Sequence, residues 1–251
     1  MTTVVAICKE VLKRLSQMDY EKKGGSSEER LIFPMKIQAD GTKERDRISE
    51  QELRQLFIEE FKAKHEDLYY SIETPTKNKY SFTNENNEKK IADNVNVGQS
   101  ALVDMCVFEK EKKSYKRILN IEFKHKNATK DNISKDVLKL MHEEQSGAFI
   151  LLLKNTNGGT LNNLAETRFG VIDKLIDSLM FHQSKKVLWN GGDEKFIELI
   201  ILSLEEKEKK TELPFIFYRK ISISDLDSLD NSIVKWKREV LVDGEFNIMI
   251  R

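Results

Sequence analysis

The chain contains little cysteine and little proline, with two cysteines and three prolines among 251 residues. Cys8 and Cys106 lie within hydrophobic patterns and have no metal-binding or framework spacing, so the sequence predicts buried thiols and no disulfide or zinc site. So few prolines exclude collagen-like and proline-rich classes. Hydrophobic residues make up 39% of the chain, a share that fits a folded protein with a core.

Long hydrophobic runs are also missing. No run approaches the roughly 18 residues that a membrane-spanning helix needs, and the first residues carry too short a hydrophobic stretch for a secretory signal. We therefore expect a soluble, cytoplasmic protein with no membrane partner. The length suits a single domain over 1–251, with a core at about 49–220, an added helix at 3–18 and an added segment at 221–251.

An excess of charge of either sign is absent, because 42 Lys and Arg balance 42 Asp and Glu. The protein as a whole therefore has no field that attracts nucleic acid, and any such partner must meet a local basic group. Two stretches of the chain carry such a basic group. The first, which we interpret as a solvated hairpin tip, comprises Lys110, Lys112, Lys113, Lys116 and Arg117. The second borders the residues discussed below and comprises Lys124, Lys126, Lys130, Lys135 and Lys139.

The hydrophobic pattern predicts a mixed α/β fold. Helical spacing is found at 4–18, at 49–65 after a capping box of Ser49 and Glu52, at 131–144 and at 161–181. A strand is expected within 68–76, where Pro75 should stop it. Residues 101–108 and 115–124 are expected to form a hairpin, and further strands are expected at 147–154, 196–204 and 214–223. The run at 147–154 is hydrophobic throughout and follows a helix, which predicts a strand covered on both faces with a parallel neighbour. The pattern ends with a short helix near 232–238 and a strand near 246–250.

The hairpin carries charged residues at positions that should face a core. Alternation along the strands places Asp104 on one face of the first strand, and Glu122 and Lys124 together on one face of the second. A carboxylate in such a strand needs a partner or a cation. Two carboxylates suit Mg²⁺, which keeps several waters and completes its coordination shell with a substrate phosphate. A neighbouring lysine can orient or help to deprotonate a metal-held water. The alternative for these three residues is a cross-strand salt bridge.

The same residues resemble a known family. An Asp in a hydrophobic strand, a hairpin, then Ile-Glu-Phe-Lys and a helix resemble the PD-(D/E)XK nuclease superfamily, over about residues 49–153. Val103 stands where the family commonly has proline. The resemblance implies a restriction-endonuclease-like core, in which a mixed central β-sheet is flanked by helices. It also implies that Asp104, Glu122 and the carbonyl of Phe123 bind Mg²⁺, with Mn²⁺ as a substitute, and that Lys124 activates water.

The resemblance also implies an acid from an upstream helix. Glu50, in the first turn of the helix at 49–65 and on the flank of its hydrophobic face, is the first choice. Glu60 is the second, Glu52 the third because capping accounts for it, and Glu73 is a further option.

Several polar residues near the hairpin are candidates for contacts with nucleic acid. Ser100, Lys126, Lys135 and Lys139 could meet phosphates, although a solvated helix face on which Asp136 pairs with the lysines is an equal reading. His142 could be a general acid or base, but a structural role is favoured. The pair Gly158 and Gly159 lacks the context of a nucleotide-binding loop.

These expectations lead to a metal-dependent endonuclease that hydrolyses DNA, in restriction or defence as the resemblance implies, acting as a homodimer or with a partner subunit. One alternative is an inactive nuclease-fold module for binding or assembly. Another is a nuclease for RNA or repair intermediates.

Overall fold

The structure is a computed structural model that describes residues 3–22, 27–37, 44–81, 90–91, 98–126, 128–161, 170–184, 189–206 and 213–248. The helices are α1 (Val4–Gln17), α2 (Glu50–Lys64), α3 (Lys130–His142), α4 (Gly158–Leu161) and α5 (Val171–Ser184), with 3-10 turns η1 (Ile223–Ser228) and η2 (Ile233–Lys235). The strands are β1 (Met35–Ile37), β2 (Glu44–Asp46), β3 (Leu68–Ser81), β4 (Lys90–Ile91), β5 (Gln99–Glu111), β6 (Ser114–His125), β7 (Ser146–Thr156), β8 (Phe196–Glu206), β9 (Phe215–Ser222), β10 (Lys237–Val242) and β11 (Glu245–Ile248).

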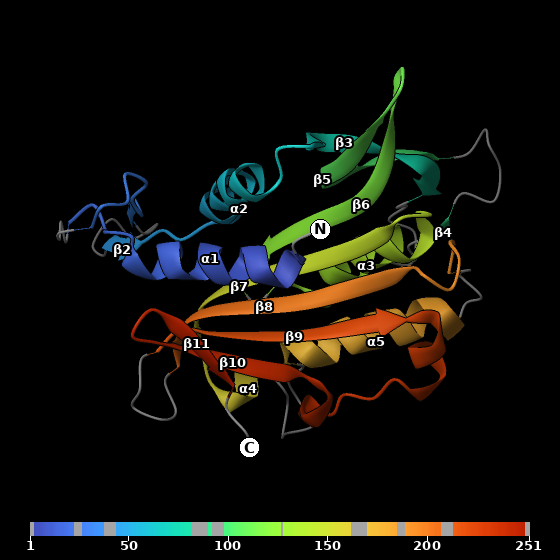
Figure 1. The fold of residues 1–251 in the computed structure, drawn as a ribbon. Coiled ribbons are helices and arrows are strands. Elements are labelled where there is room, and N and C mark those ends of the chain that lie inside the picture. The colour runs from blue at the N-terminus through green and yellow to red at the C-terminus, as the bar shows by residue number, and fades with distance from the viewer. Residues whose placement is uncertain are drawn as a thin grey trace.

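One mixed sheet contains most of the described strands, and β1 and β2 form a separate two-stranded sheet. The mixed sheet has nine strands in the order β11-β10-β9-β8-β7-β6-β5-β3-β4. The neighbours β6, β7 and β8 are parallel, and the pairs on either side of them are antiparallel. Helices α1 and α2 lie on one face of the sheet, while α3 and α5 lie on the other (Figure 1). The expected α/β class, with a mixed central sheet and flanking helices, is confirmed.

Alternating side chains of β7 fill both cores. Ala148, Ile150 and Leu152 pack toward α1 and α2, and their neighbours Phe149, Leu151 and Leu153 pack toward α3 and α5. All six are almost completely buried, which explains why this strand reads as an unbroken hydrophobic run. The parallel neighbour expected for the run at 147–154 is confirmed on both sides, in β6 and β8.

Three predicted segments differ from the structure. Of the helix expected at 161–181, the structure describes α5, which begins at Val171 after the non-helical Gly170, while 162–169 lie outside the described residues. The strand expected to end at Pro75 continues to Ser81, because Pro75 still lies opposite Leu102 and the pairing with β5 resumes at Lys79 after a register shift. An irregularity in the ladder thus accommodates a residue without an N–H group. At 232–238 the expected helix is only the 3-10 turn η2, and the segment continues into β10, whose pairing with β9 outweighs its local pattern.

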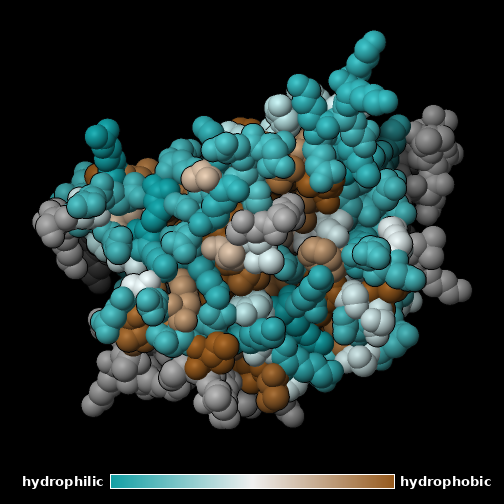
Figure 2. All heavy atoms as spheres, viewed as in Figure 1, coloured by the Kyte–Doolittle hydropathy of each residue, from teal (hydrophilic) through white to brown (hydrophobic). Residues whose placement is uncertain are grey.

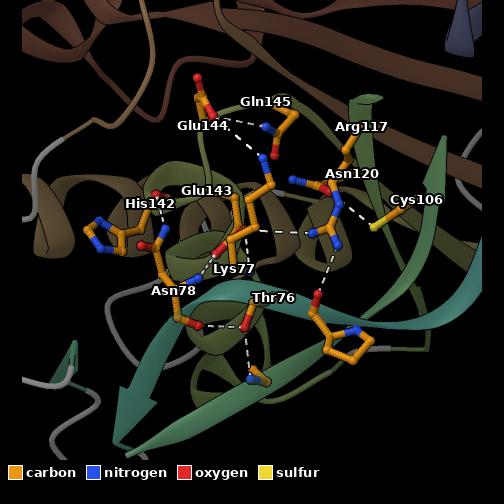
Figure 3. Close-up of polar contacts among 12 residues, drawn as sticks. Thr76, Lys77, Asn78, Cys106, Arg117, Asn120, His142, Glu143, Glu144 and Gln145 are labelled. Atoms are coloured by element: carbon orange, nitrogen blue, oxygen red, sulfur yellow. Dashed lines mark hydrogen bonds and ion pairs between the residues drawn. The ribbon is translucent and has the colours of Figure 1, made fainter. Parts of the chain in front are cut away.

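A buried carboxylate fixes β3 against the end of α3. Glu143 is fully buried and accepts hydrogen bonds from the backbone N–H groups of Lys77 (3.0 Å) and Asn78 (3.1 Å) and from the hydroxyl of Tyr80 (3.0 Å). The guanidinium of Arg117 lies 3.7 Å away (Figure 3). These contacts satisfy the backbone where the β3 ladder is irregular, and they hold the sheet edge beside the helix that covers the candidate site.

Hydrophilic side chains cover most of the face shown in Figure 2, with smaller hydrophobic groups between them. Among the described residues, no helix combines the length and the hydrophobicity needed to cross a membrane.

Candidate active site

The candidate site lies where β5 and β6 separate. On this side their pairing ends at Met105 and Ile121, after which β5 stays paired with β3 and β6 with β7. In the opening, the carboxylate of Asp104 accepts a hydrogen bond of 2.7 Å from the backbone N–H of Phe123. Asp104 is half-buried, and its side chain thus takes the place of the next ladder contact between the strands.

Glu122 is the most deeply buried acid of the site. Its side chain points toward α3, where the ammonium of Lys139 lies 2.5 Å from its Oε1 atom. Its other oxygen, Oε2, is buried and has no hydrogen-bond partner among the described residues. Burial raises the pKa of Glu122 well above its ordinary value, Asp136 and Asp104 add to this effect, and Lys139 opposes it. The ionised form of Glu122 is therefore disfavoured, and a positive charge beside this carboxylate would stabilise it.

Lys124 occupies the next position on the same face of β6. Its ammonium lies 2.9 Å from Oδ2 of Asp136 on α3 and donates a hydrogen bond of 3.0 Å to the carbonyl of Phe123. Burial by itself would lower the pKa of Lys124, but the carboxylates of Asp136, Asp104 and Glu50 raise it overall. Lys124 is therefore a charged group in this arrangement.

Helix α2 adds one acid from the opposite layer. Glu50, in its first turn, is half-buried; burial raises its pKa, Lys124 lowers it, and Asp104 and Asp136 raise it further. Its carboxylate is thus electrostatically coupled to Lys124, Asp104 and Asp136.

The other upstream acids are bound elsewhere. Glu52 completes the capping box with Ser49, Glu60 pairs with Arg14 at 3.2 Å, and Glu73 pairs with Arg54 at 2.7 Å.

The charges of the site do not balance. Four carboxylates (Glu50, Asp104, Glu122 and Asp136) surround two ammonium groups (Lys124 and Lys139), which leaves a formal charge of −2. One divalent cation would neutralise that excess. The oxygens of Asp104, Glu122 and the Phe123 carbonyl are the hard ligands that Mg²⁺ prefers, and the unpartnered Oε2 of Glu122 is a ready donor. The residues present therefore fit the metal that the resemblance implies.

Carboxylates alone do not make this ligand set. Among the residues described, no three His, Cys, Asp or Glu side chains are grouped so that they could hold a metal ion by themselves. The expected set uses two carboxylates and a backbone carbonyl, leaving the remaining positions to water and substrate.

The residues expected to meet phosphates fall into two groups. Ser100 and Lys126 are exposed, and Lys135 is half-buried on α3. Lys139 differs, because its side chain is only 8% exposed and its ammonium is held by Glu122, by Asp136 and by the carbonyl of Leu102 at 2.8 Å. The shared solvated helix face expected for these lysines is therefore not found at Lys139.

Two further positions are resolved by the packing of α3. His142 lies beside Tyr80, at a ring-centroid distance of 6.0 Å, at the end of the helix near Glu143. Asp136, read from the sequence as one half of a surface pair, is 5% exposed and contacts both lysines of the site. Its spacing of three from Lys139 was the one available signal, and that spacing is equally common on solvated helices.

Comparison with known proteins does not assign the chain to a family. No protein-family model, no curated protein and no solved structure matches this chain.

Proposed function

We propose that the protein is a metal-dependent endonuclease of the restriction-endonuclease-like class that hydrolyses phosphodiester bonds in DNA. The observation that carries the proposal is the opening between β5 and β6. There Asp104, Glu122 and Lys124 belong to a cluster of six charged side chains that has a formal excess of two negative charges. The order α2, β3, β5, β6, α3 and β7, with β7 parallel to β6, supports it over the span 49–153.

Each residue has a role that follows from its contacts. Asp104, Glu122 and the carbonyl of Phe123 would hold Mg²⁺, or Mn²⁺ in its place. The bound metal would polarise the phosphate and lower the pKa of a water. Glu50, on α2, is electrostatically coupled to Lys124. Its carboxylate adds a hydrogen-bond acceptor that can orient the attacking water.

Lys124 acts in this scheme as a charged group. Since the surrounding carboxylates raise its pKa, its ammonium is suited to orienting the nucleophile and to stabilising the negative charge that develops on phosphate oxygens. Deprotonation of the water by Lys124 would require these carboxylates to be neutralised first. Ser100, Lys126 and Lys135 are the proposed contacts with the DNA backbone. A homodimer or a partner subunit, acting in the cytoplasm, would allow both strands to be cut.

The test is cleavage of supercoiled plasmid, linear duplex, single-stranded DNA and RNA with Mg²⁺ or Mn²⁺. Asp104→Asn and Lys124→Met should each reduce the rate by about 100-fold or more, because each removes a group that acts on the reacting phosphate. Lys62→Met, on the exposed face of α2, is the control and should cut as the native chain does. Unchanged cutting by both site variants would refute the assignment, and cutting of RNA alone would transfer it to that substrate. If no substrate is cut and Asp104→Asn changes no metal response, the inactive nuclease-fold module is the correct reading.

A further inference from the structure

Both lysines of the site contact groups that the proposed metal would use. Lys139 lies 2.5 Å from Oε1 of Glu122, and Lys124 donates to the carbonyl of Phe123 at 3.0 Å. A divalent cation on the unpartnered Oε2 of Glu122 would lie beside the ammonium on Oε1, and two positive charges that close repel each other strongly in a buried site. Binding of the metal therefore favours movement of Lys139 away from Glu122.

Asp136 provides each lysine with a second acceptor. Its Oδ1 atom lies 2.9 Å from the ammonium of Lys139, and its Oδ2 atom lies 2.9 Å from the ammonium of Lys124. Lys139 also donates to the carbonyl of Leu102 at 2.8 Å. If Lys139 leaves Glu122, it thus retains two of its three contacts, and the move buries no unpaired charge.

We propose that Lys139 is a tethered cation that neutralises Glu122 in the metal-free protein and is displaced onto Asp136 when the metal binds. This inference rests on the proposed function, because it takes Glu122 as a metal ligand. Asp136 is then a positioning residue that accepts both ammonium groups during the exchange.

The arrangement has a cost and a benefit. A tethered ammonium competes with the metal at a high effective concentration and so weakens metal binding. In return, the fully buried Glu122 keeps a counter-ion when no metal is present, so the fold does not depend on the metal as that of a zinc finger does. Removal of Lys139 should therefore affect metal affinity and metal-free stability in opposite directions.

The experiment measures Mn²⁺ affinity without nucleic acid, from the electron paramagnetic resonance signal of free Mn²⁺, together with the melting temperature with and without metal. Lys139→Gln removes the positive charge but keeps an amide that can donate to Glu122. We expect Mn²⁺ to bind about tenfold more tightly, the metal-free melting temperature to fall, and the stabilisation by Mn²⁺ to increase. Lys62→Gln, on the exposed face of α2, is the control for the loss of one positive charge and should change the affinity about twofold or less.

A double-mutant cycle tests the part of Asp136. Asp136→Asn should weaken Mn²⁺ binding, since Lys139 loses the acceptor to which it moves, and this effect should shrink in the Lys139→Gln background. Additive effects of the two changes would overturn the exchange. So would an equal or lower Mn²⁺ affinity in Lys139→Gln while the native chain binds Mn²⁺ and Asp104→Asn does not, a result that leaves the proposed function intact. Absence of Mn²⁺ binding by every variant would overturn both proposals. Tighter binding by Lys139→Gln without cleavage of any substrate would support the exchange and contradict the nuclease.

Discussion

The hydroxyl of Tyr80 offers a sharp test of how β3 is held beside the candidate site. Tyr80 is 1% exposed and donates a hydrogen bond of 3.0 Å to the fully buried carboxylate of Glu143. Burial and this carboxylate both raise the pKa of Tyr80, so the phenol remains protonated and continues to donate. Tyr80→Phe removes the donor and leaves the ring in place.

The expected cost follows from the partners that remain. Glu143 keeps the N–H groups of Lys77 and Asn78 and the nearby Arg117, so one charge-assisted bond of four contacts is lost. Such a bond contributes about 1.5–3 kcal/mol, and for a chain of this size a loss of about 2 kcal/mol lowers the melting temperature by roughly 4–8 °C. The assay is urea unfolding followed by circular dichroism, with thermal unfolding as a second measurement.

Tyr115→Phe is the control for this prediction. Tyr115 is also in the sheet but is 55% exposed, so the change should alter stability by about 0.5 kcal/mol or less. If Tyr80→Phe cost no more than Tyr115→Phe, the argument that the Glu143 cluster secures β3 would be refuted.

Two further predictions concern other parts of the fold. Gly191 has a φ of +123°, and a Cβ atom there would lie 2.6 Å from the carbonyl oxygen of Glu144. Gly191→Ala should therefore lower the free energy of unfolding in urea by about 1–3 kcal/mol. The control is Gly192→Ala, which has nothing within 4 Å of its Cβ position and should have little effect in the same titration. Burial raises the pKa of Glu198, and Lys220 opposes this only in part. Because the folded state then holds a proton that the unfolded state releases, the free energy of unfolding should fall as the pH rises from the ordinary value of Glu through the raised one. Glu198→Gln should flatten that part of the curve, and an unchanged pH profile would contradict the burial argument.

Local pattern was sufficient to identify most of the elements. The capping box of Ser49 and Glu52 places the start of α2 at Glu50, and the unbroken hydrophobic run of β7 indicates a strand between two helical layers. Where the sequence was misleading, at Pro75 and at 232–238, pairing with a distant strand outweighed the local signal.

The sequence by itself determined which residues are available for chemistry. Strand alternation is a local property, so it was enough to place Glu122 and Lys124 on one face of β6 and to set Asp104 apart from its hydrophobic neighbours. The tertiary structure alone decided what surrounds them. Only the packing of α3 against the sheet buries Asp136 and Lys139 beside Glu122, and only the meeting of α2 with the opening between β5 and β6 couples Glu50 to the site. The sequence pattern of a charged residue on a helix is the same whether the residue faces water or a buried carboxylate. The pattern reflects the spacing within one element, whereas the contacting residue belongs to another element.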